Sequence, residues 1–284
     1  MGAGVTAPSI TAASDWPAEA LLEAFDDAFS DYIAGAPDIA LAAWPVFLRR
    51  QGIDLATSRV VAEAGRILAF SLVAPLADGR TRLATMGARR EARGSGAARA
   101  LLARSIADSR ERGDRWIELE VFAQNPRALA LYRSHGFVPV AELFGYERAP
   151  GATPADQDAA IETVDIEDAV RWLNDAAIDA LPWQVSAQAI ALAATPPSAW
   201  RRGRAQLLFH ARGEQRVVVA SLVDLGATQQ DARVLLRALA NAHPNATLAM
   251  PQLQRADLGG DAMQAEGWQR LALHQQLMRC RFDN

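Results

Sequence analysis

The spacing of hydrophobic and polar residues changes several times along the chain, and each change marks an expected element. Residues 116–122 alternate with a period of two, which is typical of a strand with one buried face. Residues 97–112 carry apolar positions at three- and four-residue spacing, which predicts an amphipathic helix. A strand is expected at 82–86. A second helix begins at Pro126 and is stopped by Gly136, and a final pair of strands is expected at 137–140 and 143–147.

A segment rich in proline, glycine and alanine at 148–156 interrupts this order and is typical of a linker. The order of elements then begins again, with a strand at 160–164, a helix at 166–180, a hairpin of 205–211 and 216–223, a helix at 229–242, a strand at 247–250, a short helix ending near residue 267 and a strand at 271–282. We therefore expect two parts, residues 1–150 and 157–284. The second part is either a copy of the first or an unrelated α+β domain.

The composition argues against several classes of protein but does not indicate a reaction. Half of the 284 residues are hydrophobic, 22% are charged and the net charge is −4, so a basic field that would attract nucleic acid is lacking. No apolar run reaches the length of a membrane span. The single cysteine cannot form an internal disulfide, and the four scattered histidines offer no metal-ligand spacing. We expect no nucleic acid, membrane or metal partner and, without a signal-peptide pattern, a cytoplasmic location.

The turn at residues 93–98, Arg-Gly-Ser-Gly-Ala-Ala, connects the expected strand at 82–86 to the helix that follows. Gly94 and Gly96 allow unusual backbone dihedral angles and the close approach of a ligand. The start of the helix presents unpaired amides and the positive end of its dipole, which favour an anion such as a pyrophosphate. The turn lacks the Gly-Lys-Ser/Thr of a Walker loop and the spacing of the dinucleotide fingerprint. Taken alone, it is either a phosphate site or an ordinary tight turn.

The wider pattern around this turn resembles the GNAT superfamily of N-acetyltransferases. The resemblance spans about residues 80–148 and lies in the motifs Arg93-x-x-Gly96-x-Ala98, Leu119-Glu-Val, Asn125, Ala128, Leu131-Tyr132 and Gly136-Phe137. It implies an α/β (α+β) fold with a mixed, mostly antiparallel central sheet flanked by helices, and acetyl-CoA as co-substrate. Because the order of elements repeats, we expect this fold twice in tandem.

The resemblance also implies which residues would hold acetyl-CoA. The amides of the turn would bind the pyrophosphate, and the Arg93 side chain would add charge-assisted hydrogen bonds. In the family, a splayed strand ahead of the turn holds the pantetheine arm and the thioester carbonyl with main-chain groups. The asparagine at the place of Asn125 contacts the cofactor, and this residue type also caps helices. The expected cofactor-binding residues are Met86, Gly87, Ala88, Arg93, Gly94, Ser95, Gly96, Ala97, Ala98 and Asn125.

Acetyl transfer to an amine needs an uncharged amine and a proton for the departing thiolate. Tyr132 matches the family's general acid, and a phenol with a pKa of about 10 is a compatible donor to a thiolate whose thiol has a pKa of about 8.5. The alternative for Tyr132 is packing under the sheet. Glu120 matches a glutamate that serves as base in the ribosomal-protein N-terminal acetyltransferases of this superfamily, and Glu118 shares its strand face. Ordered water is the alternative base.

The acceptor is expected to be a primary amine of a small molecule or peptide. In the family the first two helices form one wall of the acceptor site, and here the first helix carries Asp27, Asp31 and Tyr32. The two aspartates are four residues apart and so share a helix face, which suits a cationic amine or simply solvent.

The second part lacks the residues of the first. When residues 232–236 are laid on 98–102, the turn becomes Thr228–Asp231, without glycine and with an acidic residue where phosphate would lie. Met263 falls opposite Tyr132, and Ala256 opposite Asn125. The sequence therefore predicts a degenerate copy beside a single-site N-acetyltransferase, as a monomer or homodimer. Transfer to a hydroxyl, transfer of a longer acyl group, and a non-catalytic CoA-binding sensor or regulatory module are the alternatives.

Overall fold

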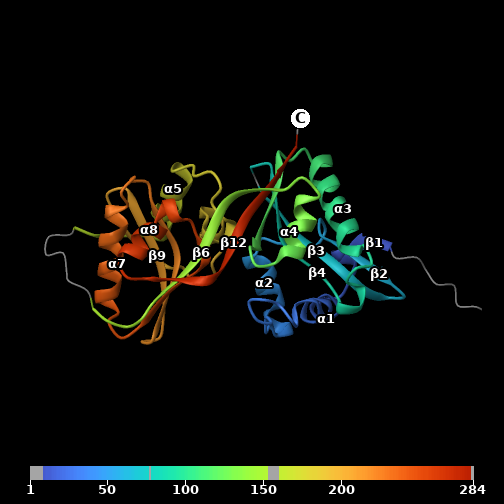
Figure 1. Cartoon of the computed structure of the whole chain (residues 1–284), viewed down its shortest axis with the longest axis horizontal. Coiled ribbons are helices and arrows are strands. Elements are labelled where there is room, and N and C mark those ends of the chain that lie inside the picture. Colours follow the sequence, from blue (N-terminus) through green and yellow to red (C-terminus); the bar gives the residue numbers. More distant parts are fainter. Residues whose placement is uncertain (1–8, 77, 153–159, 283–284) are drawn as a thin grey trace, which may run out of the picture. The chain divides into compact units, whose positions relative to one another are not determined.

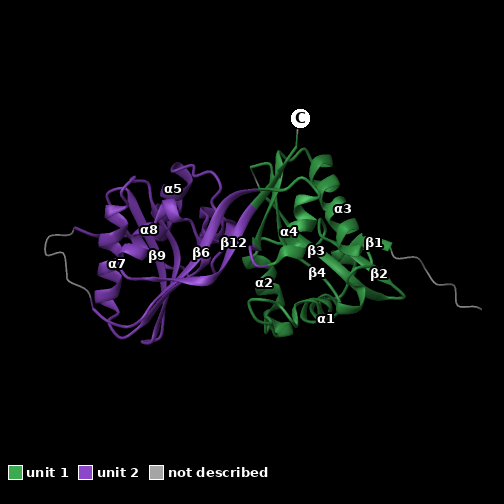
Figure 2. Cartoon of the chain, viewed as in Figure 1, with its two compact units in different colours: residues 1–121, 125–138, 278–284 green, residues 122–124, 139–277 purple. Residues whose placement is uncertain are grey.

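A computed structural model of the chain describes residues 9–76, 78–152 and 160–282. It divides into two compact units, which Figure 2 colours separately. Unit 1 comprises residues 1–121, 125–138 and 278–284, and unit 2 comprises residues 122–124 and 139–277. Both units combine strands with flanking helices, so the class is α/β, as the sequence predicts.

Unit 1 holds most of the N-terminal half of the chain (Figure 1). Its strand order is β1-β2-β3-β4-β5, antiparallel except for the parallel pair of β4 and β5. The elements, in chain order, are β1 (Ser9–Ala12), α1 (Ala18–Phe29), α2 (Trp44–Arg50), β2 (Arg59–Glu63), β3 (Arg66–Leu76), β4 (Arg80–Ala88), α3 (Ala97–Glu111), β5 (Trp116–Phe122) and α4 (Pro126–Arg133). The helix expected at 97–112 and the strand expected at 116–122 are therefore confirmed.

Unit 2 repeats this order. The strands β7-β8-β9-β10-β11 follow one another as β1 to β5 do, and within that run only β10 and β11 are parallel. The elements are β6 (Val138–Arg148), β7 (Glu162–Val164), α5 (Ile166–Asp175), α6 (Ala187–Ala191), β8 (Ser198–Arg202), β9 (Ala205–Arg212), β10 (Arg216–Asp224), α7 (Gln230–Ala242), β11 (Thr247–Gln254), α8 (Gly260–Ala265) and β12 (Gln269–Arg281). The order of elements that the sequence predicts to repeat does so.

Two expected boundaries differ from the structure. The predicted pair of strands at 137–140 and 143–147 is the single strand β6, because no turn residue interrupts it and Pro139 lies near its start, where a missing amide is tolerated. The helix predicted over 166–180 ends at Asp175. Ala177 and Ala180 have φ angles of 46° and 53°, which a right-handed helix cannot contain.

Strands β6 and β12 are each divided between the units. Beyond Val138, β6 belongs to unit 2, where it pairs with β11. β12 belongs to unit 2 as far as Leu277, whereas its end from Met278 belongs to unit 1 beside β5. The sequence predicts two parts that are each continuous in the chain, residues 1–150 and 157–284. The compact units are instead defined by which strands pair, so each unit includes a segment from the other part. Residues 139–148 therefore fall in unit 2 and residues 278–284 in unit 1.

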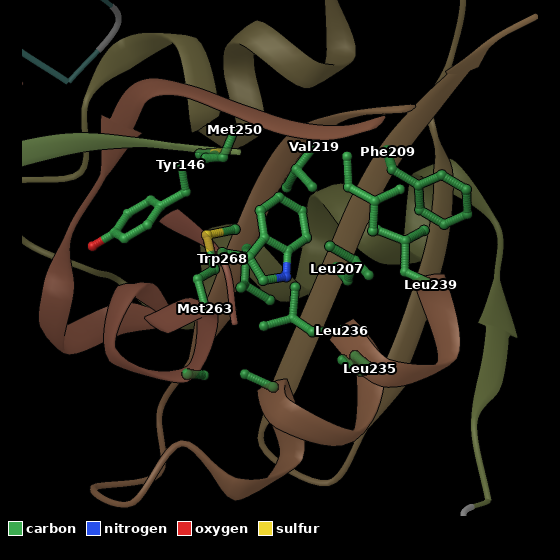
Figure 3. Close-up of a cluster of buried hydrophobic side chains, with 14 of the residues drawn as sticks. Tyr146, Leu207, Phe209, Val219, Leu235, Leu236, Leu239, Met250, Met263 and Trp268 are labelled. Carbon is green, nitrogen blue, oxygen red and sulfur yellow. The ribbon is translucent and has the colours of Figure 1, made fainter. Parts of the chain in front are cut away.

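Each unit has its own hydrophobic core. In unit 1, one cluster joins α3, α4 and β5 around Ile117 and Leu119, and it includes Met278 and Phe282 from the end of the chain. A second cluster joins α1 and α2 to β2 and β3. In unit 2, Trp268 lies among the side chains of Val219, Leu236 and Met263 (Figure 3).

Candidate active site

Strands β4 and β5 separate after their first residues. Their parallel register joins residues 80–82 to 116–118 and goes no further along β4. From Leu83 to Ala88, β4 is paired with β3 on one edge, so the backbone groups on its other edge have no partner strand within the described residues. The segment predicted to hold the pantetheine arm, Met86, Gly87 and Ala88, lies on this open edge.

Gly87 is a glycine because of packing. A Cβ atom there would lie 2.8 Å from the Phe70 ring and 2.9 Å from the Cβ of Ala28. Real Cβ atoms do not approach other atoms this closely, so α1 and β3 leave no room for a side chain at this point. Gly87 thus allows α1 to pack tightly against the strand whose opposite edge is open.

The turn between β4 and α3 has the conformation that its glycines predict. Gly94 and Gly96 have φ angles of +88° and +93°, which residues with side chains rarely adopt. A Cβ atom at either position would meet no atom within 4 Å, so space lies open over the turn. The Ser95 hydroxyl donates to the carbonyl oxygen of Ala92 at 2.7 Å and accepts from the Ala97 amide at 3.3 Å. The turn is therefore held by its own side chain, and open space adjoins Gly96 at the start of α3.

The Arg93 side chain, expected to contact pyrophosphate, is paired with Asp31 across the unit. Two guanidinium nitrogens of Arg93 donate to the two carboxylate oxygens of Asp31, each at 2.7 Å, and one also donates to the Ala28 carbonyl at 3.0 Å. These hydrogen bonds hold the pKa of Asp31 well below its usual range, at about 2. Arg93, a predicted cofactor-binding residue, is thus hydrogen-bonded to Asp31, a predicted acceptor-binding residue.

Asp27 and Asp31 do not form the shared helical face that their spacing predicts. α1 ends at Phe29, so Asp31 lies in the turn beyond it. Asp27 instead faces the buried Arg89, with 3.9 Å between a carboxylate oxygen and a guanidinium nitrogen. Each aspartate is held near a different arginine, and the helix end separates them.

Tyr132 and Tyr32 are close enough to interact electrostatically although one hundred residues separate them in sequence. Tyr132 is buried on α4, and its ring centroid is 5.7 Å from that of Phe137. Burial raises the pKa of Tyr132 far above its ordinary value, and electrostatic repulsion by the nearby Tyr32 phenol adds to the shift. Tyr32 packs against Phe29 at the end of α1, with 5.0 Å between ring centroids. The fold thus brings the predicted acid within electrostatic range of the predicted acceptor wall.

Asn125 caps α4. Its side-chain oxygen accepts a hydrogen bond from the Ala128 amide at 3.1 Å, and Pro126 takes the first helical position. The capping role that the residue type allows is therefore present. A role for Asn125 towards a cofactor stays a prediction.

Glu120, the predicted base, is buried in an ion pair with Arg82 of β4. Arg82 donates to both carboxylate oxygens of Glu120 over distances of 2.9–3.3 Å and also to the side-chain oxygen of Gln51 at 3.0 Å. The Arg82 and Glu120 side chains are only 2% and 4% exposed. Sequence reasoning missed Arg82, although the spacing of Arg80 and Arg82 matches that of Glu118 and Glu120 on the neighbouring strand.

Glu118 is held by two arginines from distant parts of the chain. Arg80 donates to one of its oxygens at 3.0 Å, and Arg279, at the end of β12, lies 3.3 Å from the other. Arg279 also stacks over the Trp116 ring, with its guanidinium carbon 4.5 Å from the centroid. Burial nevertheless raises the pKa of Glu118, because desolvation of its charged form outweighs the attraction of both arginines.

The corresponding turn of unit 2 is filled by the chain's own side chains. The Asp224 carboxylate accepts from the amides of Gly226 and Ala232 at 2.7 and 2.9 Å, so an internal anion occupies the start of α7. Asp231, the acidic residue predicted to block phosphate, accepts from the Arg204 amide at 3.0 Å. Met263, opposite Tyr132 in the repeat, is fully buried in the core. Sequence reasoning identified Asp231 but missed Asp224.

Among the described residues, no helix is both long and apolar enough to cross a membrane. The described part of the chain also holds no group of three or more histidine, cysteine or acidic side chains placed to hold a metal ion.

Known proteins share both the sequence pattern and the fold. Residues 18–137 match the family model described as the acetyltransferase (GNAT) family. A GCN5-related N-acetyltransferase from Sphaerobacter thermophilus has a similar structure with a TM-score of 0.62 at 14% identity, covering 98% of this chain and 97% of its own. Another from Anabaena variabilis gives a TM-score of 0.65 at 13% identity, covering 96% of this chain and 72% of its own.

A search of curated proteins gave no match. The two structural likenesses extend over nearly the whole chain and so include the repeated order of elements. Residues 18–137 thus match the acetyltransferase (GNAT) family, and the fold of the chain resembles that of the two N-acetyltransferase structures.

Proposed function

We propose that the protein is an acetyl-CoA-dependent N-acetyltransferase with one active site, located in unit 1. The observation that carries this proposal is the open edge of β4, which leads directly into an open glycine turn at the start of α3. Main-chain groups without a partner strand in the described part of the chain, followed by the open start of a helix, suit a long ligand with an amide-containing arm and a pyrophosphate.

The residues of unit 1 fit such a ligand in two ways. Residues 86–88 offer main-chain hydrogen bonds to an extended arm, as a neighbouring strand would. The amides of Ser95 and Ala97 are bonded within the turn. The anion site would therefore be formed by the amides of Gly94, Gly96 and Ala98, and the space at both glycines is open. Acetyl-CoA would supply the acetyl group as a thioester, and the chain would hold it, orient it and move protons.

Tyr132 is proposed as the general acid. When the amine nitrogen bonds to the thioester carbonyl carbon and the carbon–sulfur bond breaks, the Tyr132 hydroxyl donates its proton to the departing thiolate. Its raised pKa keeps that proton in place throughout the neutral range. Burial on α4 fixes the orientation of the ring.

Removal of the amine proton is proposed to fall to Glu120 or to ordered water. The ion pair with Arg82 engages both oxygens of Glu120, so a role as base requires that this pair loosen when the acceptor binds. Water needs no such rearrangement. The expected acceptor is a primary amine of a small molecule or peptide, approaching past Asp31 and Tyr32.

In unit 2, the internal carboxylate of Asp224 and the buried Met263 argue against a second site. We therefore expect a degenerate copy over residues 157–284 that contributes to the fold.

Isothermal titration of acetyl-CoA into the whole chain tests the proposal first. We expect one site per chain, followed by release of free thiol when a panel of primary amines is added. Absence of binding would reject the acetyltransferase assignment. Two sites would contradict the assignment of unit 2 as degenerate, and tight binding without thiol release for any amine would favour a CoA-binding sensor.

A further inference from the structure

Arg93 contacts both parts of the proposed site, the glycine turn before α3 and the acceptor wall at the end of α1. Its backbone belongs to the turn that precedes α3, whereas its side chain reaches the end of α1 and bonds to Asp31 and the Ala28 carbonyl. Asp31 adjoins Tyr32, whose phenol lies near that of Tyr132. A single guanidinium group therefore connects the phosphate turn to the acceptor wall.

The Arg93–Asp31 ion pair is exposed, so Arg93 can exchange Asp31 for another anion. The Arg93 side chain is 29% exposed and that of Asp31 is 48% exposed, so solvent and ligands reach both groups. Exposed ion pairs contribute little to stability, even when they are bidentate, because water and salt screen them. A pyrophosphate carries more negative charge than one carboxylate and offers the same planar pairing to a guanidinium.

We propose that Arg93 is shared between Asp31 and the pyrophosphate of the cofactor, so that cofactor binding releases the Asp31 carboxylate as a recognition group for a cationic amine. This inference rests on the proposed function and adds a substrate class and an order of events to it. Before the cofactor binds, Asp31 is masked by Arg93. Afterwards, its charge lies free beside Tyr32.

The exchange couples the two binding sites thermodynamically. Whatever free energy binds Arg93 to Asp31 must be given up when the pyrophosphate takes Arg93, so the Asp31 carboxylate opposes cofactor binding. An amine that neutralises Asp31 removes this opposition and strengthens cofactor binding by the same factor by which the cofactor strengthens amine binding.

The test is a titration of CoA into four forms of the whole chain: the wild type, Asp31→Asn, Arg93→Gln and the double variant. We expect Asp31→Asn to bind CoA about two- to five-fold more tightly than the wild type, the range that an exposed ion pair supports. Arg93→Gln should bind more weakly. In the double variant, the tightening caused by Asp31→Asn should disappear, because there is no guanidinium left to release.

Glu19→Gln serves as the matched control, because it removes the same charge from the exposed face of α1 without touching Arg93. Equal tightening by Glu19→Gln, or equal tightening by Asp31→Asn with and without Arg93, would mean that only the general field of α1 acts, and the inference would fall. No CoA binding by the wild type would overturn the proposed function itself.

A second measurement follows the carboxylate directly. The pKa of Asp31, assigned by its loss in Asp31→Asn, can be read from carboxyl carbon shifts in NMR spectra recorded against pH. We expect a pKa of about 2 without ligand and a clearly higher pKa once CoA has taken Arg93. A pKa that stays at about 2 with CoA bound would show that the Arg93–Asp31 pair persists, and would overturn the proposal.

Discussion

At the residue scale, the buried phenol of Tyr132 shows how an environment changes the acidity of a group. Tyr132 lies in the cluster that includes Leu129 and Phe137, and burial raises its pKa. The raised pKa keeps the phenol protonated at neutral pH, and it also makes the phenol a weaker acid towards a thiolate whose thiol has a pKa of about 8.5. The same burial would serve a purely structural tyrosine, so the role must be tested by kinetics.

Replacement of Tyr132 by phenylalanine removes the proton donor and keeps the packing of the ring. We expect acetyl-CoA affinity within about two-fold of the wild type and a turnover number at least about 100-fold lower, the usual contribution of a general acid. Titration calorimetry and steady-state kinetics provide the two values. Tyr146→Phe, in the core of unit 2, is the matched control. Unchanged turnover in Tyr132→Phe would remove this residue from the mechanism.

The raised pKa of Tyr132 also predicts how stability depends on pH. In the unfolded chain the phenol ionises at a pKa of about 10, whereas in the fold it retains its proton to higher pH. Above about pH 10 the unfolded state therefore binds fewer protons than the folded state, and the free energy of unfolding falls as pH rises. Thermal unfolding between pH 9 and about pH 11 should show a smaller loss in Tyr132→Phe than in the wild type. Parallel losses would contradict the shift.

Breaking the Arg82–Glu120 ion pair should lower the free energy of unfolding. Because both side chains are almost fully buried, Glu120→Gln leaves the Arg82 charge without its counter-ion, and we expect a loss of about 3–5 kcal/mol in the free energy of unfolding. Urea unfolding of Glu120→Gln and of the double variant Arg82→Met, Glu120→Leu measures this. The double variant should recover most of the loss. Its activity then separates catalysis from stability: if it retains turnover, water acts as the base.

At the element scale, the turn between β4 and α3 combines a backbone with positive φ angles at its glycines and open space beside them. Gly94 and Gly96 are glycines because of their φ angles, whereas Gly87 is a glycine because of its neighbours Phe70 and Ala28. The corresponding turn of unit 2 places Gln229 at a φ angle of +50° and closes the start of α7 with Asp224. The two units therefore share one order of elements, but the start of α3 is open in unit 1, whereas Asp224 occupies the start of α7 in unit 2.

Two substitutions at Gly96 separate strain from ligand exclusion. Gly96→Ala adds only a Cβ in a left-handed conformation, which costs about 1 kcal/mol of stability and leaves the space over the turn nearly open. Gly96→Glu adds bulk and negative charge as well. We expect acetyl-CoA binding to weaken by only a few-fold in Gly96→Ala and to be lost in Gly96→Glu. Tight binding by Gly96→Glu would mean that the pyrophosphate lies elsewhere.

At the scale of the whole molecule, the end of the chain is part of the unit that holds the candidate site. Met278, Cys280 and Phe282 belong to the same hydrophobic cluster as Tyr132, and Arg279 is bonded to Glu118. The amide of Phe282 donates to the Arg115 carbonyl at 3.0 Å. Unit 1 is therefore incomplete without residues 278–282.

Deletion of residues 278–284 should unfold unit 1. Removing several buried side chains costs about 2–5 kcal/mol each, which together approaches the whole stability of a typical domain. We expect loss of acetyl-CoA binding and of part of the cooperative transition in a thermal melt. Deletion of residues 283–284 alone is the control, because it leaves Met278, Arg279, Cys280 and Phe282 in place. Wild-type affinity in the longer deletion would contradict a role for the strand end.

Local signals in the sequence determined much of the fold and the outline of the candidate site. Alternation with a period of two identified β5, helical spacing identified α3, and Pro126 and Asn125 marked the start of α4. Gly94 and Gly96 indicated their left-handed turn, because only glycine adopts it at no cost. The family's motif also lay within a short stretch of sequence and could be identified there. These features depend on residues that are close neighbours in the chain.

Only the tertiary structure decided which distant residues meet. Strand pairing assigned β6 to unit 2 and residues 278–284 to unit 1, and it brought Arg279 to Glu118. Packing of α1 against the sheet brought Asp31 to Arg93 and Tyr32 to Tyr132. Helical spacing could not foresee the first of these pairs, because α1 ends before Asp31. The physical reason is that charge pairing and burial depend on distances in space, which the hydrophobic period of a single element does not contain.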